Sequence, residues 1–186
     1  MEKTEKAGDE MMQATHPSGA APKIMLETEG LTRHFGTLTA VDALTLSVEG
    51  GEVFGLPGPN GAGKSTAIKM LTTLLPPTAG TAHVAGFEIV RQAAQVRRVI
   101  GYVPQMLSAD GALSGYENLL VFAQLYELPH RERDQRIREA LAFMNLLDAA
   151  DRLVTTYSGG MIRRLEIAQA TLHRPQVLFL DEPTVG

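Results

Sequence analysis

Cysteine is absent from the sequence, which excludes disulfide bonds and cysteine-ligated metals and fits a reducing compartment. No apolar run reaches the ~18–20 residues that a membrane-spanning helix needs, and the N-terminus lacks the apolar core of a secretory signal. A net charge of −4 gives no indication of nucleic-acid binding. We therefore expect no nucleic-acid partner and no direct membrane insertion, so any role at a membrane needs a partner that supplies the spanning segments.

The overall composition is that of an ordinary folded domain. The chain has 186 residues, of which 44% are hydrophobic and 20% charged, enough for one domain with a core. Residues 1–23 are polar and are interrupted by Pro17 and Pro22, which predicts a disordered tail. The folded domain is expected over residues 24–186, with a helical subdomain at about 106–160.

One stretch fits the phosphate-binding pattern of Gly, four residues, then Gly-Lys-Ser/Thr. Its glycines allow backbone angles at which successive N–H groups point inward at an anion. Lys64 adds a positive charge for the β- and γ-phosphates of a nucleotide, and the Ser65 hydroxyl is suited to Mg²⁺. The predicted nucleotide-binding residues are Gly58, Pro59, Asn60, Gly61, Ala62, Gly63, Lys64, Ser65 and Thr66.

The flanking sequence supports this interpretation. Residues 53–56 form a short apolar run that predicts a strand, and residues 67–71 continue as a helix whose positive end faces the same anion. The alternative is a glycine-rich turn that happens to contain a lysine. The order of strand, loop and helix favours nucleotide binding.

Alternation and turn residues predict the other elements. Strands are expected at 24–28 (an edge strand), 44–49, 81–87 and 99–103. Ser114 and Glu117 match a capping box at the start of a helix, and Pro129 separates it from a second helix at 130–147. Arginines and acidic residues interleave on that second helix, which indicates a solvated face rather than an anion site. Residues 156–160 open a further helix.

Residues 177–180 form a continuous apolar run, which indicates a central strand buried on both faces. Asp181 and Glu182 follow it directly. Because ligands bind beyond the carboxyl ends of parallel strands, Asp181 is expected beside the phosphate loop, holding Mg²⁺ together with Ser65. Glu182 could activate the attacking water as a general base. A structural turn is the alternative, which the phosphate loop upstream disfavours.

Four motifs in this order closely resemble those of the ATP-binding subunit of ABC transporters, and in detail the drug-efflux group typified by daunorubicin-resistance ATPases. They are residues 58–66, 101–105, 157–161 and 177–184. The resemblance implies an α/β P-loop fold with a mostly parallel central sheet, an antiparallel β subdomain and a helical subdomain. It also implies an ATPase that uses ATP and Mg²⁺ to drive export of a drug-like or lipophilic substrate through a separate membrane permease.

The resemblance assigns roles to matching positions. Glu182 would be the catalytic base and Asp181 the metal carboxylate, and Gln105 would contact Mg²⁺ or the attacking water. Ser158, Gly159 and Gly160 would bind the γ-phosphate held by a second ATPase subunit in a head-to-tail dimer. Phe35 falls where the family places an aromatic ring against adenine; the alternative is a core residue of the β layer.

Two departures from the family pattern stand out. Pro57 precedes the phosphate loop where a non-proline residue is usual. The family's D-loop and switch histidine would follow Gly186 and are missing, so this chain is expected to bind ATP weakly, hydrolyse it slowly and aggregate. The implied location is cytoplasmic, peripheral on the inner membrane face through the permease. The alternatives are a truncated nucleotide-binding module with little ATPase activity and a soluble ABC ATPase without a transport role.

Overall fold

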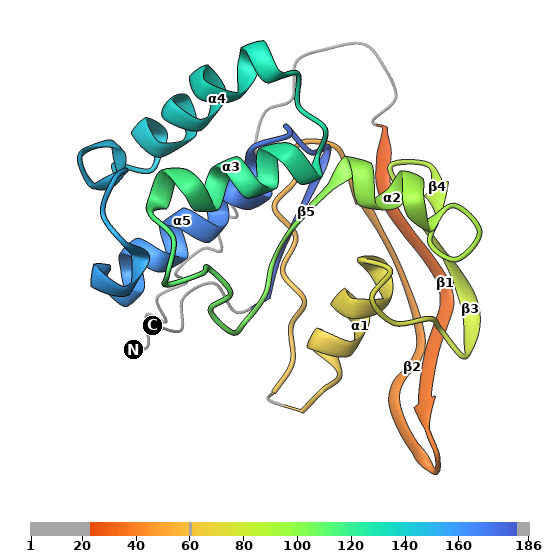
Figure 1. Ribbon diagram of the computed structural model, residues 1–186. Coiled ribbons are helices and arrows are strands. Elements are labelled where there is room, and N and C mark those ends of the chain that lie inside the picture. Colours follow the sequence, from red (N-terminus) through yellow and green to blue (C-terminus); the bar gives the residue numbers. More distant parts are fainter. Residues whose placement is uncertain (1–22, 60, 182–186) are drawn as a thin grey trace, which may run out of the picture.

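An antiparallel sheet forms one side of the chain (Figure 1). The computed structural model describes residues 23–59 and 61–181, so the predicted tail, apart from its last residue, and the predicted site residues Asn60 and Glu182 lie outside the described residues. The sheet has the order β2-β1-β3-β4. Its strands are β1 (Ile24–Phe35), β2 (Leu38–Glu49), β3 (Ala79–Val84) and β4 (Phe87–Glu88).

Strand β1 is longer and more central than its sequence predicts. The prediction of an edge strand at 24–28 is wrong, because β1 pairs on one side with β2 and on the other with β3. The partner strand β3 lies far along the chain, so the alternation of apolar and polar residues within β1 does not predict this pairing. The predicted strand at 81–87 is divided by a turn in which Ala85 and Gly86 have positive φ.

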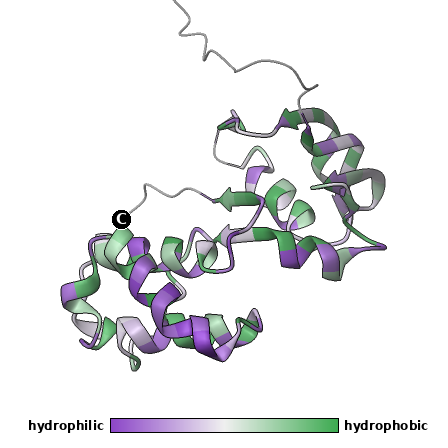
Figure 2. Ribbon diagram, turned by 90° about the horizontal axis from the view of Figure 1, so that it is seen from above, coloured by the Kyte–Doolittle hydropathy of each residue, from purple (hydrophilic) through white to green (hydrophobic). Residues whose placement is uncertain are grey.

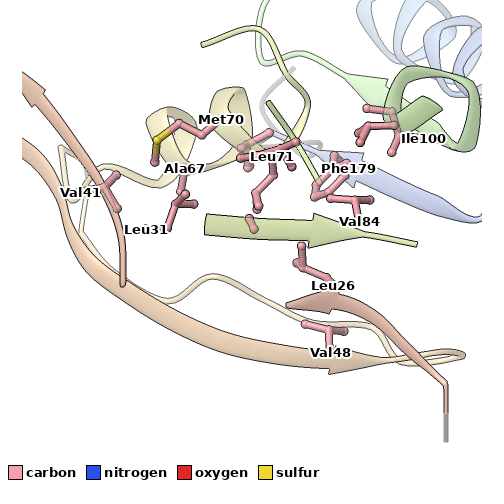
Figure 3. Packing of buried hydrophobic residues seen from close by; sticks show 14 residues of the cluster. Leu26, Leu31, Val41, Val48, Ala67, Met70, Leu71, Val84, Ile100 and Phe179 are labelled. Atoms are coloured by element: carbon pink, nitrogen blue, oxygen red, sulfur yellow. The ribbon is translucent and has the colours of Figure 1, made fainter. Parts of the chain in front are cut away.

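The first helix, α1 (Lys64–Leu71), packs its apolar face on this sheet. Figure 3 shows Met70 and Leu71 of α1 pointing toward Leu31 and Val84 of the sheet, and these four side chains are at most 1% exposed. Burial of a leucine or methionine side chain is worth about 1.5–3 kcal/mol. This core therefore fixes the helix that begins at the phosphate loop against the strands that flank it.

Two strands form the parallel part of the described chain. The helix α2 (Ala93–Val99), which the sequence did not predict, leads into β5 (Ile100–Val103). Strand β5 pairs in parallel with β6 (Val177–Leu180), with Ile100 opposite Val177 and Val103 opposite Leu180. The α/β P-loop class is therefore as predicted, and within the described residues β5 and β6 carry its parallel pairing.

The surroundings of β6 differ from the prediction. Phe179 is buried, but Leu178 and Leu180 are each 39% exposed, so burial on both faces is wrong. Residues 53–56 are also not a strand within the described chain, and the side chain of Val53 is fully exposed. Both segments line an apolar cavity of about 590 Å³, here named the β6 groove, and no described strand lies between them.

Three helices form a second packed unit, on the other side of β5 from the antiparallel sheet (Figure 1). None of the helices in the described ranges has the length and apolar character needed to span a membrane. Purple hydrophilic and green hydrophobic residues alternate along the helices in Figure 2, as expected for helices with one buried face. The helices are α3 (Gly115–Leu125), α4 (His130–Phe143) and α5 (Gly159–Thr171), with the short 3₁₀ helices η1 (Leu147–Ala149) and η2 (Val154–Thr156) before α5.

The helix signals in the sequence are largely confirmed. The Ser114 side chain accepts a hydrogen bond from the Glu117 N–H at 3.2 Å, and the Glu117 carboxylate accepts one from the Ser114 N–H at 2.8 Å. Helix α4 ends at Phe143, earlier than predicted, because Asn145 has a positive φ. Its charged residues form i,i+4 ion pairs with one another, as expected for a solvated face.

Candidate nucleotide-binding site

The phosphate loop has the backbone that its glycines predict. Gly58, Gly61 and Gly63 have φ values of 145°, 84° and 82°. At Gly63 the requirement is also steric, because a Cβ there would lie 2.0 Å from the carbonyl oxygen of Ala40 in β2. The loop therefore passes directly over β2 before it enters α1, and only glycine fits at that crossing.

The positive charge of Lys64 lies over the loop. Its Nζ donates to the carbonyl oxygens of Gly58, at 2.7 Å, and Pro59, at 2.9 Å. The N-cap of α1 is Gly63, which offers no side-chain acceptor to the first N–H groups of the helix. An ammonium group and a helix N-terminus therefore meet at one place, which is the arrangement that stabilises a bound phosphate.

Ser65 and Asp181 meet although they are far apart in the sequence. The Ser65 hydroxyl donates to Asp181 Oδ1 at 3.0 Å, and the Asp181 N–H donates to the Val103 carbonyl at 3.0 Å. Asp181 is 4% exposed. The predicted placement of Asp181 beside the phosphate loop is thus confirmed, because the end of β6 carries it there.

These two oxygen groups fit a magnesium ion. A hydroxyl and a carboxylate are hard oxygen ligands, and Mg²⁺ often takes one or two protein ligands while keeping several waters. Within the described ranges no group of three or more His, Asp or Glu side chains gathers as a metal site. The Ser65–Asp181 pair is the candidate cation site because of the chemistry of its two oxygen groups.

A cavity of about 500 Å³ opens beside the loop and is lined by β1, β2, α1 and Gln105. Phe35, at the end of β1, is 44% exposed and lines this cavity, so it is not a core residue of the sheet. The Arg33 guanidinium carbon lies 4.7 Å from the centroid of the Phe35 ring and its Nη1 donates to the Pro76 carbonyl at 2.9 Å. The Arg33 guanidinium therefore packs on one face of the Phe35 ring. This support suits the ring to stacking on a nucleotide base.

Gln105 follows the end of β5, as predicted, and lines the same cavity as Ser65. The pKa of the neighbouring Tyr102 reflects the charged groups around it. Burial and then the Asp181 carboxylate raise the pKa of the Tyr102 hydroxyl, against an opposing effect of Arg163. Gln105 and Ser65 thus line the same cavity, and a buried arginine that the sequence analysis did not assign to the site contacts the Asp181 backbone.

Ser158 is the N-cap of α5, and its Oγ accepts a hydrogen bond from the Met161 N–H at 3.3 Å. Ser158, Gly159 and Gly160 are exposed at the surface and are not among the residues that line the cavity beside the phosphate loop. Within one chain the structure therefore does not bring this turn to the loop. The predicted opening of a helix at 156–160 is confirmed.

Sequence reasoning missed two parts of the site. Residues 38–40 of β2 line the cavity, but their alternating pattern marks only a strand. Arg163 and Glu166 form a buried pair that reaches the Asp181 carbonyl. A charged pair at i and i+3 on a helix that also carries Leu165 and Ala168 was the available signal, because such residues share faces with the core.

Comparison with known proteins agrees with this geometry. Residues 41–185 match the ABC transporter family, so the chain belongs to that family. Its fold is also found in a solved structure described as the ATP-binding subunit of an ABC transporter, with a TM-score of 0.78 and 28% identity over 87% of this chain and 67% of that chain. The fold is thus that of an ABC-type nucleotide-binding domain.

Among individual proteins, the chain is 46% identical to the daunorubicin/doxorubicin resistance ATP-binding protein DrrA of Streptomyces peucetius, over 89% of this chain and 50% of DrrA. It is 41% identical to the linearmycin resistance ATP-binding protein LnrL of Bacillus subtilis, over 87% of this chain and 52% of LnrL. The Nod factor export ATP-binding protein I of Rhizobium meliloti is 40% identical over 90% of this chain and 50% of its own length. The chain spans about half the length of these curated relatives.

Proposed function

We propose that this chain binds ATP with Mg²⁺ at residues 58–66, as the ATP-binding and ATP-hydrolysing subunit of a transporter that exports a drug-like or lipophilic compound through a separate permease. The observation that supports it best is the 3.0 Å contact between Ser65 and Asp181 at the phosphate loop. A glycine-rich turn without function would not require an acidic side chain from β6 at this position. Two relatives are named for resistance to linearmycin and to daunorubicin and doxorubicin, and a third for Nod factor export, which supports the drug-export part of the proposal.

The residues have distinct tasks in this proposal. The Lys64 ammonium and the N–H groups at the start of α1 bind the phosphates, and Ser65 and Asp181 hold Mg²⁺. When bound, Mg²⁺ neutralises charge that develops on the phosphate oxygens during transfer to water. Phe35 stacks on the adenine ring. Gln105 orients the water or the cation from the cavity wall.

Two further roles rest on the family resemblance and not on contacts among the described residues. Glu182, the residue after Asp181, is assigned as the base that accepts a proton from the attacking water. Ser158, Gly159 and Gly160 are assigned to the γ-phosphate held by a second copy in a head-to-tail dimer. Their exposure and their place at the N-terminus of α5 suit an anion from outside the chain. Attachment to a permease would place the protein at the cytoplasmic face of the membrane.

Titration with a fluorescent ATP analogue tests the binding site, and the absence of tryptophan keeps the protein background low. Lys64→Ala should weaken binding by about 100-fold or more, a loss of ~2.7 kcal/mol. The matched control is Lys69→Ala, an exposed lysine of the same helix, which should bind within about twofold of the original chain. An unchanged affinity of Lys64→Ala overturns the assignment.

Turnover and partnership need separate measurements. Release of phosphate from ATP by the purified chain distinguishes an ATPase from a module that only binds nucleotide. Affinity capture from cells distinguishes a transport subunit from an ABC ATPase that acts elsewhere. Recovery of a membrane permease supports the transport role, and recovery of RNA in its place contradicts it.

A further inference from the structure

A buried ion pair lies at the junction of α5 with the two parallel strands. Arg163 Nη1 lies 3.2 Å from Glu166 Oε2, and the two side chains are 10% and 2% exposed. Such a pair is weak support for stability, because removing both charges from water offsets most of their attraction. Its presence is therefore not accounted for by the stability of the fold alone.

The pair connects three separate segments of the chain. The Arg163 guanidinium donates to Glu166, to the carbonyl oxygen of Pro104 after β5, and to the carbonyl oxygen of Asp181 after β6, at 3.1 Å for the last. Glu166 Oε1 in turn accepts hydrogen bonds from the Ser108 N–H and from the Ser108 hydroxyl, at 3.1 Å for the hydroxyl. One helix thus holds the ends of both parallel strands.

Those strand ends carry the candidate cation site. The Asp181 carboxylate accepts from Ser65, while its backbone carbonyl accepts from Arg163. That carbonyl belongs to the peptide bond between Asp181 and Glu182. The Pro104 carbonyl likewise belongs to the peptide bond that leads to Gln105. Arg163 therefore contacts the backbone next to three of the residues assigned to magnesium or water.

We propose that Arg163 is a positioning residue for the cation site: its guanidinium fixes the ends of β5 and β6 and thereby sets where the Asp181 carboxylate lies relative to Ser65. This inference rests on the proposed binding of ATP with Mg²⁺. Arginine is required because its planar fork can donate to three acceptors at once, whereas lysine presents one compact charge. Glu166 neutralises the buried charge and keeps the guanidinium aligned.

The experiment compares ATP-analogue affinity in excess Mg²⁺ with affinity in EDTA, and their ratio measures the magnesium dependence. The variants are Arg163→Met, Arg163→Lys and the double variant Arg163→Met/Glu166→Met. Arg164→Met is the control, since Arg164 is the exposed neighbour on the same helix. Thermal unfolding of each variant reports the stability separately.

Replacing an outer-shell partner of a metal ligand typically lowers the affinity for the metal by about 10- to 100-fold. We expect the affinity ratio to fall by about that factor in both Arg163 single variants and in the double variant, with binding in EDTA changed by less than about threefold. The double variant separates positioning from folding, because a buried ion pair can be replaced by apolar side chains with little loss of stability. Arg164→Met should keep the original ratio.

Two results overturn the proposal. The first is a folded double variant or Arg163→Lys variant that keeps the original ratio. The second is an equal loss of affinity in Mg²⁺ and in EDTA, which would show a structural role alone. Failure of the proposed function is distinguishable from both, since it would appear in the unsubstituted chain as an affinity that Mg²⁺ does not change.

Discussion

The Ser65 hydroxyl donates to a carboxylate oxygen of Asp181 at 3.0 Å, across a separation of 116 residues. Ser65 lies in the first turn of α1 and Asp181 follows β6, so the contact joins the two halves of the candidate site. Because Asp181 is buried, the hydrogen bond from Ser65 compensates part of the cost of removing its carboxylate from water. The contact makes the geometry of the phosphate loop and the position of β6 depend on each other.

Gly63→Ala should destabilise the protein and remove nucleotide binding. An alanine at this position would need a positive φ, and its Cβ would lie 2.0 Å from the Ala40 carbonyl oxygen. Gly61→Ala is the control, because Gly61 has nearly the same φ and no atom within 4 Å of its Cβ. The backbone strain alone costs about 1–2 kcal/mol, so Gly61→Ala should lose that much free energy of unfolding and Gly63→Ala clearly more. Equal losses in urea titrations would show that β2 yields at the crossing.

Pro57→Leu should change ATP affinity by less than about tenfold, which is less than ~1.4 kcal/mol. Pro57 is exposed and precedes the N–H groups of the phosphate loop, and it has no N–H of its own to lose. Titration with the same ATP analogue measures the effect. A larger change would show that the ring of Pro57 shapes the loop.

The exposed β6 groove leads us to predict that the protein associates with itself. Within the described chain β6 pairs only with β5, and an unpaired strand edge beside an apolar groove favours contact with another molecule. Leu178→Lys should therefore lower light scattering and shift size-exclusion profiles toward the monomer. Phe143→Lys is the control, since Phe143 is 82% exposed and lies on α4, away from the groove lining. Equal effects of the two substitutions would contradict a specific role of the groove.

We expect the buried ring of His173 to make the protein less stable at acidic pH. Its ring stacks on Tyr126 with centroids 3.7 Å apart, and its Nε2 lies 2.9 Å from the Ile100 carbonyl oxygen, which makes Nε2 the protonated nitrogen of the neutral ring. The other nitrogen, Nδ1, is buried without a hydrogen-bond partner in the described residues. Burial lowers the pKa of His173 below its ordinary value of 6.5, against a smaller raising effect of the hydrogen bond to Ile100.

The sign follows from proton binding. Between the lowered pKa of the folded state and the ordinary pKa, the unfolded chain binds more protons, so stability falls as the pH falls through this window. Urea unfolding at pH 7.5 and 5.0 should show a smaller pH dependence in His173→Gln than in the original chain. His83→Gln, at an exposed histidine, is the control for replacing a histidine by glutamine. An identical pH dependence in His173→Gln would refute the role of this ring.

Local chemistry accounts for the features that the sequence predicted well. The start of α1 after the phosphate loop, the capping box at Ser114 and the opening of a helix at residues 156–160 each depend on residues within a few positions of one another. Their side chains satisfy or expose backbone groups that any helix end presents, whatever surrounds it. The nucleotide loop and these three helix starts could thus be predicted without knowledge of the packing.

Placement across the chain was decided by tertiary structure alone. The position of β1 between β2 and β3 and the contacts of Arg163 join segments that are distant in sequence. The exposure of Leu178, and the lack of a strand at 53–56 within the described chain, likewise depend on which segments pack nearby. An apolar run records that a segment can be buried, but which faces are covered depends on the neighbours that pack there. The sequence by itself determined the chemistry that residues 58–66 offer to a phosphate and pointed to Asp181 as the carboxylate beside them. The packing of β5, β6 and α5 decided the contact between Ser65 and Asp181 and the arginine that binds the Asp181 backbone.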